Sequence, residues 1–217
     1  LFVFLHKYGL FDENAKEFVL PDRYMGQFTT LLEETVKYFF IKGVVYNSVN
    51  AVRDTVYKVC VDIEKEKDYL SDYKTNIYKE DLADFKDLLA TDRLKRYQRG
   101  VVLLAAYLNP KQDKKDFANF MDGKVEIEHI LPKKWNNYDG WTDKLWSEKL
   151  NTLGNLVPLS KKLNIAAKNE FFDKKKEYYK KSEVQDVKDL LKVKEWKPGD
   201  VMAKQKEKKE RLLKYFI

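Results

Sequence analysis

Apolar residues recur at intervals of three and four from Lys16 to about Leu108, and this spacing limits what the first half of the chain can form. Side chains spaced in this way gather on one face of a helix. Only eight glycines and five prolines occur among the 217 residues, which favours long helices over a strand-rich sandwich. We therefore predict four or five packed helices, with apolar faces in the runs 28–40, 45–63, 82–89 and 94–108, before Asn109-Pro110 stops the last one.

Beyond residue 110 the pattern predicts shorter elements. Alternation of polar and apolar residues indicates one short strand, and a brief apolar segment indicates a second. We predict, in chain order, a strand at 124–130, a helix at 142–150, a strand at 155–159 and helices at 161–179, 182–193 and 200–216. Thr142 is expected to cap the first of these helices, and Gly154 to close it in the left-handed conformation. The predicted fold class is therefore mainly α with a small β component, that is, α+β.

Charge is divided unevenly along the chain. Of 42 basic and 35 acidic residues, the segment 1–110 holds 16 and 17, so the segment 111–217 holds 26 and 18. The second half thus carries a net charge of +8 and the first half −1. A basic surface attracts phosphate backbones without reading sequence, although lysine-rich helices also occur simply as solvated surfaces.

Composition excludes several classes of protein. The single cysteine, Cys60, lies in an apolar run, so we expect a buried thiol and no disulfide framework. No apolar run approaches the roughly 18 residues of a membrane span, and we expect a soluble, cytoplasmic protein without a membrane partner. Because the chain opens on Leu1 rather than methionine, we expect it to be a fragment of a longer polypeptide.

One polar constellation indicates chemistry. His129 follows Glu128 in the first predicted strand, Asn155 begins the second, and Asn164 comes nine residues later. To cleave a phosphodiester, an enzyme must deprotonate water and stabilise the charge that develops on the phosphate. A neutral imidazole next to one divalent cation, held by carboxylate and amide oxygens, can do both. Successive strand residues point to opposite faces, so Glu128 and His129 can serve one site only at a strand end or a bulge.

These residues belong to three ordered motifs. Glu-His-Ile-Leu-Pro lies at 128–132, Leu-Gly-Asn-Leu-x-x-Leu at 153–159, and Leu-Asn-x-x-x-x-Asn-x-x-Phe-x-x-Lys-x-x-x-Tyr-x-x-Ser at 163–182. Together they resemble the HNH nuclease domain found C-terminally in GmrSD-type modification-dependent restriction enzymes. The wider resemblance is to the ββα-metal, or His-Me finger, fold of HNH nucleases. It implies a ββα-metal core with an inserted helix at 116–182, preceded by the helical region predicted from the spacing, 1–115, and followed by helices that pack on the core, 183–217.

The resemblance also implies roles for individual residues. His129 would be the general base and Glu128 a metal ligand, while Asn155 would either orient the imidazole or brace the loop. Asn164 would complete the metal site, with Asn169 as the alternative amide. A last group would contact backbone phosphates or pack between helix and sheet: Lys168, Lys175 and Tyr179. The family usually has glutamine where this chain has Lys133, and the gap between His129 and Asn155 is longer than in minimal HNH units.

The function implied is a metal-dependent DNA endonuclease that uses Mg²⁺, or Mn²⁺, and acts on double-stranded DNA. It would be the nuclease part of a larger restriction or phage-defence protein, whose upstream domain senses modified DNA or uses nucleotide. Two alternatives stay open at this point. One is a catalytically silent module that binds nucleic acid or a protein partner, and the other is a nuclease toxin directed at RNA.

Overall fold

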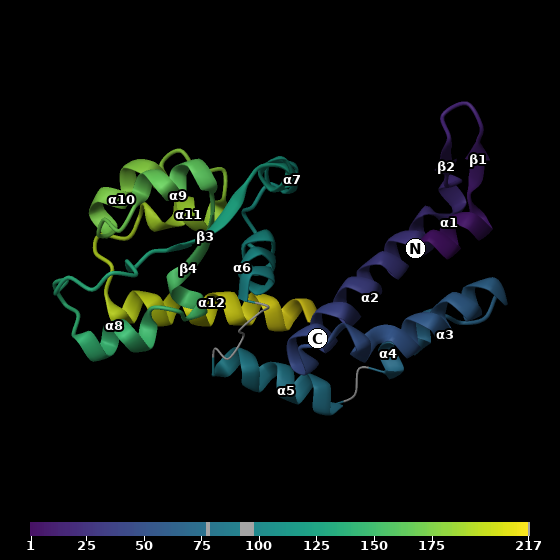
Figure 1. Cartoon of the computed structure of the whole chain (residues 1–217), viewed down its shortest axis with the longest axis horizontal. Helices are drawn as coiled ribbons and strands as arrows, with labels where there is room; N and C mark the ends of the chain where they lie inside the picture. Colours follow the sequence, from purple (N-terminus) through teal and green to yellow (C-terminus); the bar gives the residue numbers. More distant parts are fainter. Residues whose placement is uncertain (77–78, 92–97, 217) are drawn as a thin grey trace. The chain divides into compact units, whose positions relative to one another are not determined.

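The computed structural model describes residues 1–76, 79–91 and 98–216, and these fold mainly into helices with two small antiparallel sheets (Figure 1). The chain divides into two compact units, Leu1–Leu88 and Leu89–Ile217. In the described part of the chain, no helix combines the length and the apolar character that a membrane crossing requires.

The first unit surrounds an aromatic core. Its elements are α1 (Phe2–Tyr8), β1 (Leu10–Asp12), β2 (Glu17–Val19), α2 (Asp22–Tyr46), the short 3₁₀ helix η1 (Val49–Val52), α3 (Arg53–Glu64), α4 (Leu70–Thr75) and α5 (Lys79–Ala90), whose last residues cross the division. The core comprises Phe4, Leu31, Tyr38, Val52, Val59, Ile63, Tyr69 and Tyr73. Within this unit the buried Lys42 of α2 forms an ion pair with Asp81 of α5 at 2.8 Å.

Two expectations for this unit are wrong. Residues 17–19 form a strand and not a helix, because the Asp12 carboxylate accepts hydrogen bonds from the backbone of Asn14 and Ala15 and so turns the chain back on itself. The run 45–63 is not one helix. Asn47 adopts φ 51° and ends α2, and Ser48 caps η1 before α3 begins.

The second unit is built around one buried strand pair. Its elements are α6 (Gln98–Tyr107), α7 (Lys114–Asp122), β3 (Val125–His129), α8 (Asp143–Lys149), the 3₁₀ turn η3 (Leu153–Asn155), β4 (Leu156–Ser160), α9 (Lys161–Ala167), α10 (Phe172–Tyr179), α11 (Gln185–Leu190) and α12 (Pro198–Phe216). Both predicted strands are confirmed, with each end within one residue of the prediction, and Thr142 caps α8 as predicted. The predicted start of the helix at 94–108, residues 94–97, lies outside the described residues.

Two further expectations fail in this unit. The predicted helix 161–179 is two helices, because Lys168 adopts φ 50° and ψ −147° and ends α9. Gly154 does not have a positive φ. Instead, α12 passes so close that a Cβ on residue 154 would lie 2.0 Å from the Val201 carbonyl oxygen. Glycine is therefore required here by the approach of another helix.

Helix α12 supports the strand pair from below in Figure 1 and packs against η3, α6 and α8. Its buried Lys208 donates hydrogen bonds to the carbonyl oxygens of Leu156, at 2.5 Å, and Leu153, at 3.3 Å. Burial lowers the pKa of this ammonium to about 8. The irregular backbone before β4 thus receives donors from a helix more than 50 residues later.

Candidate functional site

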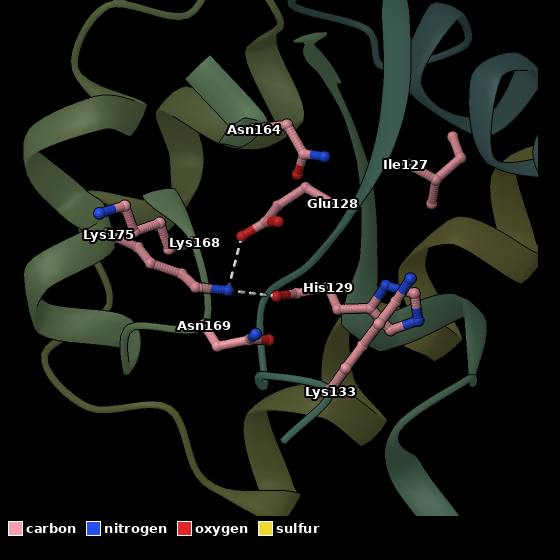
Figure 2. Close-up of a pocket in the computed structure, with 8 residues that line it drawn as sticks. All are labelled: Ile127, Glu128, His129, Lys133, Asn164, Lys168, Asn169 and Lys175. Carbon is pink, nitrogen blue, oxygen red and sulfur yellow. Dashed lines mark hydrogen bonds and ion pairs between the residues drawn. The ribbon is translucent and has the colours of Figure 1, made fainter. Parts of the chain in front are cut away.

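A polar pocket of about 150 Å³ opens at the end of β3, and it contains most of the residues singled out from the sequence (Figure 2). Strand β3 contributes three lining residues, the following loop one, and α9 to α10 the rest. The lining residues are Ile127, Glu128, His129, Lys133, Asn164, Lys168, Asn169 and Lys175. Two other residues expected at the site, Asn155 and Tyr179, do not line the pocket and are fully buried.

Strand β3 presents Glu128 and His129 to different sides. Its antiparallel pairing with β4 is regular up to the last pair, His129 with Leu156, so the two side chains follow the strand pleat. Figure 2 shows the Glu128 carboxylate directed toward Lys175 and Asn164, whereas the imidazole of His129 points away from Lys175. His129 is the final strand residue, but the pairing stays regular through it, so no bulge brings its side chain to the same side as Glu128, as the sequence argument required.

Glu128 is anchored by two buried groups from α10. Its Oε1 accepts hydrogen bonds from Lys175 Nζ at 2.7 Å and from the Tyr179 hydroxyl at 2.8 Å. Lys175 also donates to the backbone oxygen of His129, at 2.6 Å. Burial lowers the pKa of the Lys175 ammonium, while burial and the Glu128 carboxylate raise the pKa of Tyr179. Neither group faces solvent, and both hold the end of β3.

Asn164 bonds to a carboxylate that the sequence argument missed. Its Nδ2 donates to Oε2 of Glu126 at 2.6 Å. Glu126 lies two residues before Glu128 and therefore on the same face of β3, which is the signal that could have identified it. The amide oxygen of Asn164 points toward the Glu128 carboxylate (Figure 2). The Glu128 carboxylate and the Asn164 amide oxygen thus face the same part of the pocket, with Glu126 beside them.

His129 has one bound nitrogen and one unbound nitrogen. Nε2 lies 3.0 Å from Oδ1 of Asn151, a residue that no sequence motif indicated. Nδ1 is buried and has no hydrogen-bond partner in the described part of the chain. Burial lowers the pKa of the imidazole to about 4, assisted by the charges of Lys133 and Lys175 and opposed by the bond to Asn151. The ring is therefore neutral at neutral pH.

Asn155 braces the loop that follows β3. Its Oδ1 accepts from the Leu131 backbone nitrogen at 2.7 Å and from the Trp196 indole at 3.1 Å, and its Nδ2 donates to the Leu150 carbonyl oxygen at 2.8 Å. Of the two roles expected for Asn155, these bonds support bracing. The contact with the imidazole is made by Asn151.

Lys168 and Asn169 are exposed on the rim of the pocket, between α9 and α10. Lys168 holds a backbone conformation that residues other than glycine rarely adopt. Asn164, and not Asn169, makes the hydrogen bond to a β3 carboxylate. Within the described ranges, no group of three or more His, Cys, Asp or Glu side chains is arranged to hold a metal ion.

Comparison with known proteins identifies a family whose model matches this chain. No curated protein sequence matches the chain. The family model described as GmrSD restriction endonucleases, C-terminal domain, matches residues 74–210, which include every residue of the pocket. A match over more than half of the sequence shows membership, and it implies a nuclease-related domain of restriction proteins. The chain belongs to the family of C-terminal domains of the GmrSD restriction endonucleases.

Proposed function

We propose that the second unit is a metal-dependent HNH-type endonuclease domain that hydrolyses phosphodiester bonds in double-stranded DNA. In this proposal β3, β4 and α9 form a ββα-metal unit. The observation that carries it is the pocket itself, which is lined by a carboxylate, Glu128, an amide, Asn164, and a neutral imidazole, His129. We further propose that an upstream domain of the same polypeptide selects modified DNA.

The pocket offers the ligands that a hard divalent cation prefers. Both hydrogen bonds to Glu128 use Oε1, which leaves Oε2, and the bond made by Asn164 uses Nδ2, which leaves its amide oxygen. Carboxylate and amide oxygens suit Mg²⁺ and Mn²⁺. Glu128 and Asn164 would hold the cation, with Glu126 adjacent. When bound, it supplies positive charge that stabilises the charge developing on the phosphate.

The residues of this chain would carry out the rest of the reaction. His129 accepts a proton from water while the water oxygen forms a bond to phosphorus and one phosphorus–oxygen ester bond breaks. The departing oxygen takes a proton from solvent. Lys133 and Lys168, on the rim, would bind neighbouring phosphates. Asn155, Lys175 and Tyr179 would keep the end of β3 in place.

One observation favours a second candidate, a catalytically silent module that binds nucleic acid. The Lys175 ammonium already neutralises the Glu128 carboxylate at 2.7 Å, as a cation would. Such a module would bind DNA in a salt-dependent manner without any metal requirement, and it would tolerate Asn164→Ala. An RNA-directed nuclease would share the pocket chemistry and is distinguished by its substrate.

The test is cleavage of plasmid DNA and of a matched RNA by the purified chain, with Mg²⁺, Mn²⁺ or a chelator. We expect metal-dependent nicking of DNA and a loss of about 100- to 10,000-fold in His129→Ala, because the general base is removed. His6→Ala is the matched control, since His6 is an exposed residue of α1, and it should cleave normally. Circular dichroism checks the folding of both variants. A wild-type chain that is inert with every metal and both substrates would sink the proposal.

A further inference from the structure

The two ring nitrogens of His129 have different surroundings, and this difference determines which of them carries the hydrogen. A neutral imidazole carries hydrogen on one nitrogen only, and the other nitrogen is the base. Nε2 faces the amide oxygen of Asn151 at 3.0 Å. An amide oxygen accepts hydrogen bonds and cannot donate them, so this contact requires the hydrogen to be on Nε2. Nδ1 is then the nitrogen with the lone pair, and it has no partner among the described residues.

Asn151 is itself held from both sides. Its backbone oxygen accepts a hydrogen bond from Gln98 Nε2 of α6 at 2.8 Å. The carbonyl oxygen of Leu150, immediately before it, accepts from Nδ2 of Asn155 at 2.8 Å. A side chain just beyond the end of α8 therefore starts from a fixed backbone, which reduces the conformational freedom that it loses on binding the imidazole.

Asn155 links this arrangement to the strand end. The same amide that fixes Leu150 also binds the backbone of Leu131, two residues after His129, at 2.7 Å. Asn155 is fully buried and, among the described residues, bonds to the two segments that carry the His129–Asn151 pair and not to the imidazole itself. A small change at Asn155 is thereby transmitted to both sides of the pair.

We propose that Asn151 is a positioning residue that accepts a hydrogen bond from Nε2–H of His129 and so holds the imidazole in the tautomer whose lone pair is on Nδ1. Only the effect of this tautomer on cleavage rests on the proposed nuclease function. The choice of nitrogen and the part of Asn151 in that choice are properties of the folded chain, and they can be measured without substrate.

The experiment is ¹⁵N NMR of the imidazole nitrogens in the full chain. The chain has only two histidines, so a His6→Gln background leaves the signals of His129 alone. We expect a pyrrole-type shift for Nε2 and a pyridine-type shift for Nδ1. Asn151→Leu, which removes the acceptor, should move both shifts toward averaged values, and Asn151→Asp, which retains an acceptor oxygen, should restore the Nε2–H form. Asn119→Leu, the same change at an exposed position of α7, should leave them unchanged.

The second measurement is the DNA-cleavage activity of the variants. Asn151→Leu should reduce kcat by about 10- to 100-fold at an unchanged KM, since fewer molecules hold the required tautomer. A wild-type chain protonated on Nδ1, or an Asn151→Leu variant that keeps the Nε2–H form, would overturn the inference. A chain that holds this tautomer under the control of Asn151 but cleaves nothing contradicts the nuclease proposal and leaves the positioning of the ring by Asn151 supported.

Discussion

The two sheets have the same topology and differ in nearly everything else. Each is an antiparallel pair of strands, but β1 and β2 are joined by residues 13–16, whereas residues 130–155 separate β3 from β4. All three residues of β1 are exposed, and the first four residues of β4 are buried. The first pair is a local hairpin, and the second is the centre of a core.

The long connection is what turns the second pair into a candidate site. It contains Asn151, which contacts the imidazole, and Asn155, which holds the loop after His129. A four-residue turn has no room for such groups. The paired strands therefore supply only a rigid support. The side chains that contact the imidazole or hold the loop come from the connection between the strands, residues 130–155.

The largest effect is expected where the second sheet is tied to α10. Lys175→Met leaves the Glu128 carboxylate buried without its cation and should lower the free energy of unfolding by about 3–5 kcal/mol. Urea denaturation measures this. Lys174→Met is the matched control, because the neighbouring Lys174 is exposed in its pair with Glu170, and we expect less than about 0.5 kcal/mol. Equal effects at both positions would mean that the buried pair does not stabilise the sheet.

A smaller effect is expected at the turn that enters β4. Gly154→Ala would place a Cβ 2.0 Å from the Val201 carbonyl oxygen and should cost about 1–3 kcal/mol, because α12 must move. Gly26→Ala is the control in the first unit, since a Cβ there meets nothing within 4 Å and alanine favours the helix. Thermal unfolding of both variants measures the difference. A harmless Gly154→Ala would show that the connection is looser than the packing implies.

The smallest effect is expected in the exposed hairpin. Val19→Ser, in β2, should change the free energy of unfolding by less than about 0.5 kcal/mol, because the side chain is already half exposed. The same substitution in the buried strand, Val157→Ser, should cost about 2–4 kcal/mol through lost apolar contacts and a buried hydroxyl. If the two variants were equally stable, the contrast between the sheets would be wrong.

The sequence predicted elements well where a local pattern is enough. Alternation identified β3, and Thr142 correctly marked the start of α8. The family motifs also singled out Glu128, His129 and Asn164, and all three line one pocket. The two elements were predicted from spacing along one segment, which is what a single sequence records, whereas the grouping of the pocket residues came from the family resemblance.

The failures involve partners that lie far apart along the chain. Asn164 bonds to Glu126, and the imidazole contacts Asn151, because the tertiary fold brings their segments together. Gly154 was predicted to adopt a left-handed conformation, whereas glycine is required there because α12 approaches closely. Such an approach leaves no signal in the neighbouring sequence. The break at Lys168 carries no glycine, so periodicity continued through it. The roles of the pocket residues in catalysis stay predictions.

The support that α12 and the preceding loop give to β4 has a consequence for protein synthesis. Trp196 binds the Asn155 side chain, and Lys208 binds the carbonyl oxygens on both sides of that residue. A nascent chain that has left the ribosome only as far as residue 182 has all of its motif residues but none of these supports. We therefore expect the pocket to assemble late in translation, after the emergence of α12, so that an incomplete chain near nucleic acid lacks an ordered site.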